Sequence, residues 1–433
     1  MAMVQAAQKK CFAEHLYHHR IESILHKVKT TPLPLTPAEG KPKRVRMEKK
    51  RILYVSHNLV GVDPFGGVEV YVDLLTKTLP EEYETLIYYP DRKDSSGKRI
   101  FLLNVKTSQK TEHTFEREYD ASFLLDSERE SWFRKILHQE RIDLVHFQHM
   151  MGHPWSLPLI ARSLGIPVLM TIPDYFPVCH RANLTSSEKQ YCNIPHLPLV
   201  TCDICLQKNY GVIFGSQSSR RTFIAAIFEN IDSIIFLSKS EREIVESLFP
   251  VLKGAPKVLV EGFPIVDRPF SLELRNNQNK VLTVAVPGNF KITKGADSLC
   301  KIFNAMRDEP VEFHIYGANH IRSGTFFSEI SQALQGPNIK IHGPYSEDSL
   351  HENLLKADVS LLLSVWPETY VLTLSESWRA GVVPIVTDIG ALGERVEDRV
   401  NGLKVPVDQP GSVVQLLREF IADRNELKRM RKN

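Results

Sequence analysis

Two series of short apolar runs, separated by glycine loops and helix-like segments, constrain the fold of this 433-residue chain more than any other feature. The first series begins at residues 51–57 and the second at 281–288. Runs of this length are typical of buried strands in parallel sheets, and their alternation with helices is typical of doubly wound α/β domains. The sequence therefore predicts two such domains, with further strands at residues 85–89, 144–147, 168–172, 233–237, 311–316, 339–342, 359–364 and 383–387.

A loop-like stretch at residues 261–280 separates the two series of strands. It contains glycine, two prolines and a run of polar residues, and it has no apolar periodicity. Such a composition is typical of a connection between domains. We therefore expect an N-terminal Rossmann-like domain over residues 51–265 and a C-terminal one over 266–433, which face each other across a cleft. Because such sheets bind ligands beyond the carboxyl ends of their strands, this cleft is the expected active site.

Residues 1–50 form an N-terminal extension that differs from the rest of the chain in charge. The extension has a net charge of +7, whereas the remaining residues carry a net charge of −4. We expect a helix at residues 8–29 and then a proline-rich, basic linker at 30–44, since proline disfavours regular structure. The functional alternative for the linker is peripheral contact with an anionic membrane surface.

The overall composition excludes several classes of protein. A hydrophobic content of 42% and a charged content of 24% are typical of globular proteins. The formal charge of +3 is too small to imply a nucleic-acid partner. No run approaches the ~18 apolar residues that span a bilayer, and the first 30 residues lack the apolar core of a secretory signal. We therefore expect a cytoplasmic protein, either free or peripheral to a membrane.

Four of the six cysteines gather in one insertion, which we place at residues 176–210. A Cys-x2-Cys pair with two further cysteines nearby fits tetrahedral coordination of a structural zinc ion. Such an ion would stabilise an insertion that has little core of its own. The alternatives are reduced thiols and, in an oxidising compartment, disulfides. The four candidate ligands are Cys179, Cys192, Cys202 and Cys205.

Two carboxylates stand at a predicted strand-to-helix junction within residues 364–384. Glu368 lies in the loop, and Glu376 lies about two turns into the helix. Carboxylates are strong acceptors for sugar hydroxyls, and the amides at a helix N-terminus suit a phosphate. The alternative is that Glu376 is an ordinary solvated residue. Its apolar neighbours Leu374 and Trp378 argue against this, because an unpaired carboxylate among them is costly.

Together with the Ala-Gly-x-x-Pro sequence that follows, this Glu-x7-Glu pattern resembles the signature of retaining GT-B glycosyltransferases of family 4. The resemblance covers residues 51–420 and implies a GT-B fold with two Rossmann-like domains. It also implies transfer of a sugar from a nucleotide-sugar with retention of the anomeric configuration. Four other segments resemble motifs of this family in the same order, namely Phe65-Gly-Gly-Val-Glu69, Asp143-Leu-Val-His-Phe-Gln-His149, Gly288-Asn-Phe-x-x-x-Lys294-Gly295 and Thr387-Asp-Ile-Gly-Ala-Leu-Gly-Glu394.

The resemblance implies a role for each matching residue. His149 and Glu368 are the implied catalytic residues at the reacting sugar, and Lys294 would pair with the diphosphate while Glu376 binds the ribose. No cofactor is implied for catalysis, because basic side chains and backbone amides stabilise the departing diphosphate. The residues implied in binding the nucleotide-sugar are Gly66, Gly67, Asn289, Lys294, Tyr370, Val371, Leu372 and Glu376.

Three departures from the family pattern leave other functions open. Asn289 replaces the usual arginine of the phosphate-binding loop, although Lys291 is a candidate substitute. The second histidine of a strand-end His-x-His pattern comes one residue late, at His149, and Gln148 is its competitor. Pro173 replaces a histidine that precedes an aspartate in many relatives. The alternatives are a catalytically silent nucleotide-sugar-binding or scaffold module and a GT-B sugar-nucleotide epimerase.

The resemblance also implies the partners of the protein. They are a nucleotide-sugar donor and a glycan or lipid-linked acceptor, used in polysaccharide or glycoconjugate biosynthesis. In relatives, helices beyond the equivalent of residue 433 cross back onto the N-terminal domain. We therefore expect the chain to be part of a longer polypeptide or a complex.

Overall fold

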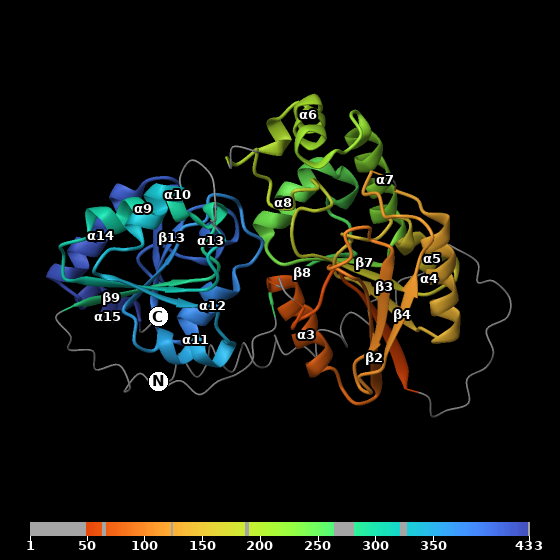
Figure 1. Ribbon diagram of the computed structural model, residues 1–433, viewed down its shortest axis with the longest axis horizontal. Coiled ribbons are helices and arrows are strands. Elements are labelled where there is room, and N and C mark those ends of the chain that lie inside the picture. Colours follow the sequence, from red (N-terminus) through yellow and green to blue (C-terminus); the bar gives the residue numbers. More distant parts are fainter. Residues whose placement is uncertain are drawn as a thin grey trace. The chain divides into compact units, whose positions relative to one another are not determined.

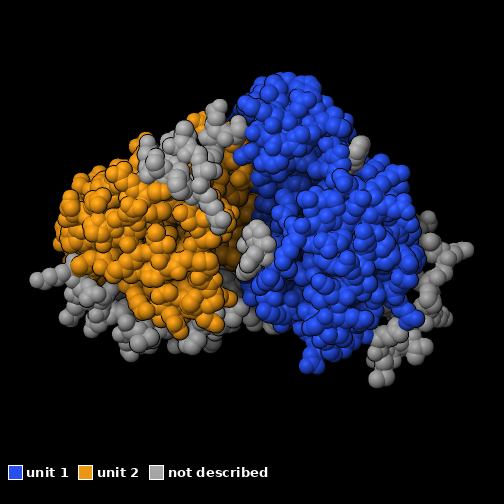
Figure 2. Space-filling view, viewed as in Figure 1, with its two compact units in different colours: residues 1–182, 193–237, 242–264 blue, residues 183–192, 238–241, 265–433 orange. Residues whose placement is uncertain are grey.

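The computed structural model describes residues 49–62, 66–122, 124–186, 190–263, 281–320 and 327–431. The chain divides into two compact units (Figure 2). The expected helix at 8–29, the basic linker at 30–44 and most of the loop-like stretch at 261–280 lie outside the described residues. Unit 1 comprises residues 1–182, 193–237 and 242–264, and unit 2 comprises residues 183–192, 238–241 and 265–433.

Unit 1 is built on an eight-stranded sheet with the strand order β4-β3-β2-β1-β5-β6-β7-β8 (Figure 1). In this order, the six strands from β2 to β8 are parallel to one another. Strand β3 is antiparallel to both of its neighbours, β2 and β4. The strands are β1 (Lys50–Val55), β2 (Tyr83–Pro90), β3 (Arg99–Asn104), β4 (Lys110–Thr114), β5 (Leu144–Phe147), β6 (Val168–Ile172), β7 (Ser233–Phe236) and β8 (Val258–Val260).

Helices connect these strands and pack on the sheet. The central strands β5, β6 and β7 are buried along their whole length, as expected for parallel strands that are covered on both faces. The helices are α3 (Gly67–Thr78), α4 (Ser127–Gln139), α5 (Leu157–Ser163), α6 (Leu199–Tyr210), α7 (Ser216–Asn230) and α8 (Lys239–Leu248), and short 3-10 helices lie at Ile194–His196 and Pro250–Leu252.

Unit 2 is built on a fully parallel sheet with the order β11-β10-β9-β12-β13-β14. Its strands are β9 (Leu282–Pro287), β10 (Val311–Tyr316), β11 (Ile339–Gly343), β12 (Val359–Leu362), β13 (Val383–Thr387) and β14 (Leu403–Val405). Its helices are α9 (Ala296–Ala305), α10 (Phe327–Ala333), α11 (Glu347–Leu354), α12 (Leu372–Arg379), α13 (Gly390–Arg395), α14 (Pro410–Ala422) and α15 (Asn425–Met430), with a 3-10 turn at Ile292–Lys294.

Alternating side chains of β9 show how unit 2 buries both faces of its sheet. Leu282, Val284 and Val286 pack in one cluster with α9, α14 and α15. Ala285 points to the opposite face and packs with α11. Figure 1 shows α9, α10 and α14 on one side of this sheet and α11 and α12 on the other. The period of two along a strand produces this arrangement directly.

The predicted fold class, α/β with two doubly wound parallel sheets, is confirmed. In each sheet the strand order reverses at one point, between β1 and β5 in unit 1 and between β9 and β12 in unit 2. Ligands of doubly wound sheets bind beyond the carboxyl ends of the strands at such a reversal. These two places are therefore where functional side chains are expected. Within the described ranges, no helix is long and apolar enough to cross a membrane.

Candidate functional site

Two loops of unit 2 meet where its strand order reverses. Residues 288–295 follow β9, and residues 364–371 follow β12. The Lys294 ammonium forms an ion pair with one carboxylate oxygen of Glu368, and the Ser364 hydroxyl donates to the other. The Glu368 side chain is 7% exposed, whereas that of Lys294 is 38% exposed. The site thus presents a cation at its surface above a buried, fully oriented carboxylate.

Glycines allow the backbones of this site to approach closely. Gly295 has a φ of +83°, and a Cβ atom there would lie 2.1 Å from the carbonyl oxygen of Leu363. Gly390 has a φ of +58°, and a Cβ atom there would lie 2.4 Å from the Cα atom of Pro367. Only glycine combines these backbone angles with such short approaches. Glycine at these two positions therefore allows the loops that carry Lys294 and Glu368 to pack closely against neighbouring backbone.

A second lysine lies beside the Lys294–Glu368 pair. Burial and the neighbouring charge of Lys294 lower the pKa of Lys291, and the carboxylate of Glu368 offsets this only in part. Lys291, the candidate substitute for the missing arginine, thus lies within electrostatic reach of both residues. Asn289, which replaces that arginine, makes a structural contact instead: its side-chain oxygen accepts a 3.0 Å hydrogen bond from the backbone N–H of Ala318. Asn289 therefore braces the loop after β10.

Arg395 fixes the loop that contains Glu368, and the sequence analysis did not identify it. Its guanidinium donates to the carbonyl oxygens of Tyr370 (2.6 Å) and Val371 (3.2 Å) and to the hydroxyl of Ser375 (2.7 Å). It also lies 3.9 Å from the centre of the Tyr370 ring. Val371 has a φ of +68°, which is strained for a β-branched residue. The one sequence signal that could have identified Arg395 was its position directly after the Thr387–Glu394 motif.

The other residues predicted to bind the nucleotide-sugar lie at the start of α12. Tyr370 is buried, Val371 is the N-cap residue, and Leu372 opens the helix. Glu376 is half-buried one turn later. Burial raises the pKa of Tyr345, and the carboxylate of Glu376 raises it further, so these two side chains lie close together. The structure therefore brings the predicted residues of unit 2 into one region, around two loops and one helix.

The reversal point of unit 1 carries a pair of histidines. The rings of His57, after β1, and His149, after β5, lie 4.2 Å apart. Glu69 accepts a 3.0 Å contact from His57 and a 2.7 Å hydrogen bond from the backbone N–H of Gly66. Burial and the charge of His149 lower the pKa of His57 despite the presence of Glu69. Gly66 and Gly67 at the start of α3 are thus fastened to the end of β1.

Both ring nitrogens of His149, the predicted catalytic histidine, are occupied. Nδ1 accepts a 3.0 Å hydrogen bond from the backbone N–H of Met151, and Nε2 lies 3.0 Å from a carboxylate oxygen of Asp174. Nδ1 must therefore be the unprotonated nitrogen, and Nε2 donates. Burial alone would raise the pKa of Asp174, but His149 and the backbone N–H of Phe176 hold it below its ordinary value. His149 lies at the expected place with its hydrogen-bonding capacity used.

A small pocket of about 10 Å³, which is room for about one water molecule, lies beside His149 at the carboxyl ends of β5 and β6. Gln148 lines it, and so does Pro173, the residue that departs from the family pattern. The remaining walls are mainly apolar and aromatic, and the Trp155 and Phe176 rings stack there at 5.9 Å. The complete lining consists of Phe147, Gln148, His149, Met150, Trp155, Met170, Thr171, Ile172, Pro173, Asp174, Phe176 and Pro177.

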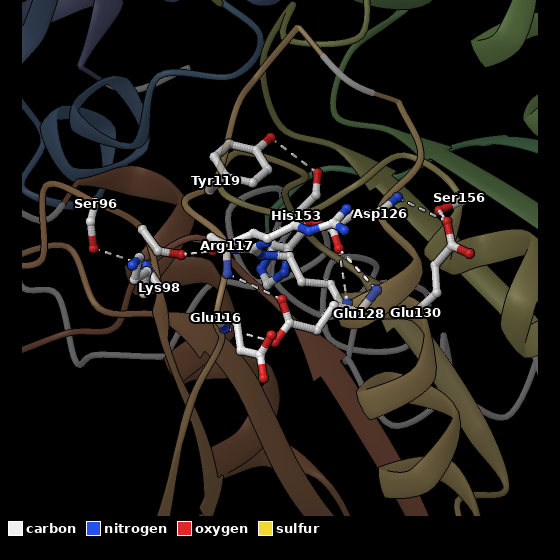
Figure 3. Close-up of polar contacts among 12 residues, drawn as sticks. Ser96, Lys98, Glu116, Arg117, Tyr119, Asp126, Glu128, Glu130, His153 and Ser156 are labelled. Atoms are coloured by element: carbon white, nitrogen blue, oxygen red, sulfur yellow. Dashed lines mark hydrogen bonds and ion pairs between the residues drawn. The ribbon is translucent and has the colours of Figure 1, made fainter.

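A polar network stabilises the chain that forms one wall of this pocket (Figure 3). The Tyr119 hydroxyl donates to the carbonyl oxygen of His153 at 3.2 Å, and Arg129, which is buried, pairs with Asp126. The His153 ring lies 2.7 Å from the carbonyl oxygen of Ser56 at the end of β1. Burial lowers the pKa of His153 to about 4, so the ring is neutral and donates. The wall is thus tied to the sheet.

The four cysteines are not arranged as the predicted zinc site. None of the four is in a disulfide, and the described part of the chain contains no group of three or more His, Cys, Asp or Glu that could hold a metal ion. Burial raises the pKa of Cys179 and of Cys202, which favours the neutral thiol. The Arg221 guanidinium lies 4.0 Å from the Cys202 sulfur. Cys179, Cys202 and Cys205 lie close enough for their charges to affect one another, but the described residues do not complete a metal site around them.

The chain matches two protein-family models that follow one another along the sequence. Residues 65–259 match the model described as Glycosyltransferase Family 4, and residues 267–433 match the model described as Glycosyl transferases group 1. The chain is also similar to an uncharacterized glycosyltransferase of Methanocaldococcus jannaschii. The two are 21% identical over 82% of this chain and 85% of the relative.

Solved structures share the fold at low sequence identity. Sucrose-phosphate synthase of Thermosynechococcus elongatus is 16% identical, with a TM-score of 0.61 over 89% of this chain and 92% of its own. HepE of Anabaena in complex with UDP is 11% identical, with a TM-score of 0.57 over 88% of this chain and 92% of its own. At this level of identity the likeness supports the shared fold, namely the same two-sheet architecture.

Proposed function

Because the chain belongs to the group 1, family 4 glycosyltransferases, we propose that it is a retaining enzyme that transfers a sugar from a nucleotide-sugar. The proposed acceptor is a glycan, a lipid-linked molecule or another acceptor in polysaccharide or glycoconjugate biosynthesis. The observation that carries this proposal is the Lys294–Glu368 pair at the reversal point of unit 2, with Lys291 beside it. Unit 2 is accordingly the donor-binding unit.

In this proposal the two lysines act on the leaving diphosphate. Negative charge develops there as the bond to the sugar breaks, and fixed cations lower the barrier because they need no reorganisation. Glu368, oriented by Ser364, accepts hydrogen bonds from the hydroxyls of the transferred sugar. Glu376 accepts from the ribose. Arg395 acts indirectly, because it positions the loop between these carboxylates.

A donor experiment distinguishes this proposal from its alternatives. HepE structures have been solved with UDP and with UDP-glucose, so UDP-glucose is the first donor to test. We expect the full chain to bind UDP in a calorimeter and to release UDP slowly from UDP-glucose, with water as the acceptor. Binding without release would indicate a silent module. Conversion of UDP-glucose to another UDP-sugar, followed by NMR, would indicate an epimerase.

Metal removal is expected to leave turnover unchanged. In this proposal lysine side chains, and not a metal ion, neutralise the diphosphate. Release of UDP in buffer with EDTA should therefore equal release in buffer with Mg²⁺. The measurement is UDP release under both conditions, with a metal-dependent glycosyltransferase as the positive control. Strict dependence on Mg²⁺ or Mn²⁺ would contradict the proposed chemistry.

We also propose that unit 1 contacts an anionic membrane surface through α6 and the loop after it. Exposed clusters of apolar side chains mark interaction sites. The cluster includes two aromatic residues, and Lys208 is exposed beside it, whereas Asp203, the one acidic residue of 199–215, is buried. Aromatic and basic groups without exposed carboxylates suit a headgroup layer. The exposed apolar residues are Val200, Ile204, Tyr210, Ile213 and Phe214.

Co-sedimentation with vesicles tests this surface. We expect the protein to bind vesicles of phosphatidylcholine and phosphatidylglycerol, and the Ile204→Ser/Phe214→Ser double variant to lose most of this binding. Ile341→Ser is the matched control, because Ile341 is equally exposed but lies on β11 of unit 2. Equal binding by the double variant, or binding to pure phosphatidylcholine alone, would contradict the proposal.

A further inference from the structure

Two imidazole rings meet across the neighbouring strands β10 and β11 of unit 2. Nδ1 of His314 lies 3.0 Å from Nε2 of His342, and the two ring planes differ by only 16°. The hydroxyl oxygen of Tyr316, two residues further along β10, lies 3.4 Å from the same Nδ1. Imidazole nitrogens and tyrosine oxygens are both metal ligands in proteins. Two such atoms thus surround a third at ligand-to-ligand spacing.

A β-bulge brings His342 to this position. The pairing of β10 with β11 shifts its register between Ile315 and Tyr316, which leaves His342 as an extra residue of β11. A bulge re-aims the side chain of its extra residue, and bulges are common at sheet edges and beside functional sites. Strand β11 is the edge of its sheet, and His342 is exposed there. An ion can therefore reach the two rings from the solvent.

A carboxylate selects the nitrogen of His314 that has the free lone pair. Nε2 of His314 lies 3.4 Å from a carboxylate oxygen of Glu312, and Lys340 pairs with the same oxygen at 2.8 Å. Because a carboxylate only accepts, Nε2 carries the proton and Nδ1 is the acceptor. A carboxylate that orients the second nitrogen of a histidine in this way is typical of metal-binding histidines.

Two donors compete for this one lone pair. Nε2–H of His342 and the hydroxyl of Tyr316 both lie within reach of Nδ1 of His314, but only one of them can donate to it at a time. Burial raises the pKa of Tyr316 to about 12, so its oxygen holds a proton. Burial also lowers the pKa of both histidines, which favours the neutral rings that bind metals.

We propose that His314 and His342, with the oxygen of Tyr316 as the third ligand, bind a divalent transition-metal ion that prefers imidazole, Zn²⁺ or Cu²⁺. On binding, the proton of Nε2 of His342 moves to Nδ1 of that ring, and the hydroxyl proton of Tyr316 passes to the solvent. Two nitrogens bound to tetrahedral Zn²⁺ lie roughly 3.3 Å apart, so a small rotation of the rings is sufficient.

This site is distinct from the other sites considered above. Its third ligand is a tyrosine, so it is not a cluster of three His, Cys, Asp or Glu, a kind of cluster that the described residues lack. None of its residues belongs to the Lys294–Glu368 site, so the inference goes beyond the proposed function. The bound ion would fasten the edge strand β11 to β10.

Calorimetry with Zn²⁺ tests the pair of histidines. The full chain, without a tag and stripped of metal, should bind one equivalent more Zn²⁺ than His342→Ala, and Zn²⁺ should raise its Tm more than that of the variant. The matched control is His138→Ala, because His138 is exposed on α4 of unit 1. It should behave as the wild type, although the N-terminal extension holds further histidines. Equal stoichiometry and equal Tm shifts in His342→Ala and the wild type would overturn the inference.

Two further variants test the site without altering either ring. Glu312→Ala should weaken Zn²⁺ binding at this site by 10- to 100-fold, whereas Glu312→Gln should keep most of the affinity because its amide oxygen still accepts from Nε2 of His314. With Cu²⁺ as the probe, the wild type should show a tyrosinate-to-copper absorption band that Tyr316→Phe lacks. Unchanged affinity in Glu312→Ala, or a band that persists in Tyr316→Phe, would overturn the proposed ligand set.

Discussion

Replacing Lys294 by alanine should lower turnover roughly 30- to 150-fold at saturating donor. The ammonium is the exposed cation of the unit 2 site, and the loss of one fixed group that stabilises developing charge typically costs about 2–3 kcal/mol. Lys291 limits the loss, because it lies within electrostatic reach and retains part of the positive charge. The measurement is single-turnover release of UDP from UDP-glucose.

The matched control for this experiment is Lys301→Ala. Lys301 lies on α9 of the same unit, where it is 62% exposed and pairs with Asp297 one turn away. An exposed pair of this kind contributes little, so the control should keep its turnover and its Tm. If Lys294→Ala and Lys301→Ala are equally active at saturating donor, the diphosphate is bound elsewhere and the proposed site is wrong.

Glutamine substitutions at Glu368 and Glu376 should each have an effect of tenfold or more, but on different quantities: kcat for Glu368 and the affinity for UDP for Glu376. Glu368→Gln should leave the affinity for free UDP near that of the wild type and lower kcat, because its partner is the sugar. Glu376→Gln should weaken UDP and UDP-glucose alike, because the ribose is bound before and during the reaction. A hydrogen bond to a charged group contributes about 1.5–3 kcal/mol, which sets the size of both effects.

The structure adds a reason to expect that Glu368→Gln remains folded. Ser364 can still donate to the amide oxygen of the new side chain, although the ion pair with Lys294 is lost. Calorimetry with UDP and single-turnover release should be measured for both variants beside their Tm values. Loss of UDP binding in Glu368→Gln, with intact binding in Glu376→Gln, would reverse the two roles.

Arg395 illustrates what the sequence analysis missed in unit 2. Its contacts with Tyr370, Val371 and Ser375 join segments that are 20 to 25 residues apart in the sequence. No local pattern predicts which arginine will be buried against a given loop. The motif that precedes Arg395 was identified, but its contribution became apparent only from the packing of α13 beside the loop after β12.

The hairpin of β3 and β4 was missed for a different reason. β4 has the sequence Lys-Thr-Glu-His-Thr and is largely exposed. It lacks the apolar alternation by which strands are recognised. Its backbone pairs with β3, residues Arg99 to Leu103 against Thr114 to Lys110, and this pairing supplies the order that its side chains do not. Strand identity at a sheet edge is thus decided by a neighbour.

The sequence by itself determined the two doubly wound sheets, the loops that bear Lys294 and Glu368, and the helix that bears Glu376. Periodicity of apolar residues and glycine-containing strand ends are local signals, and they survive without knowledge of distant contacts. Tertiary structure alone decided which polar groups are used. Adjacent residues Gln148 and His149 look equally suitable in sequence, but folding gives the His149 side chain two partners and the Gln148 side chain none among the described residues. Hydrogen-bond saturation depends on segments such as residues 151 and 174 arriving from other parts of the chain, so spacing could not predict it.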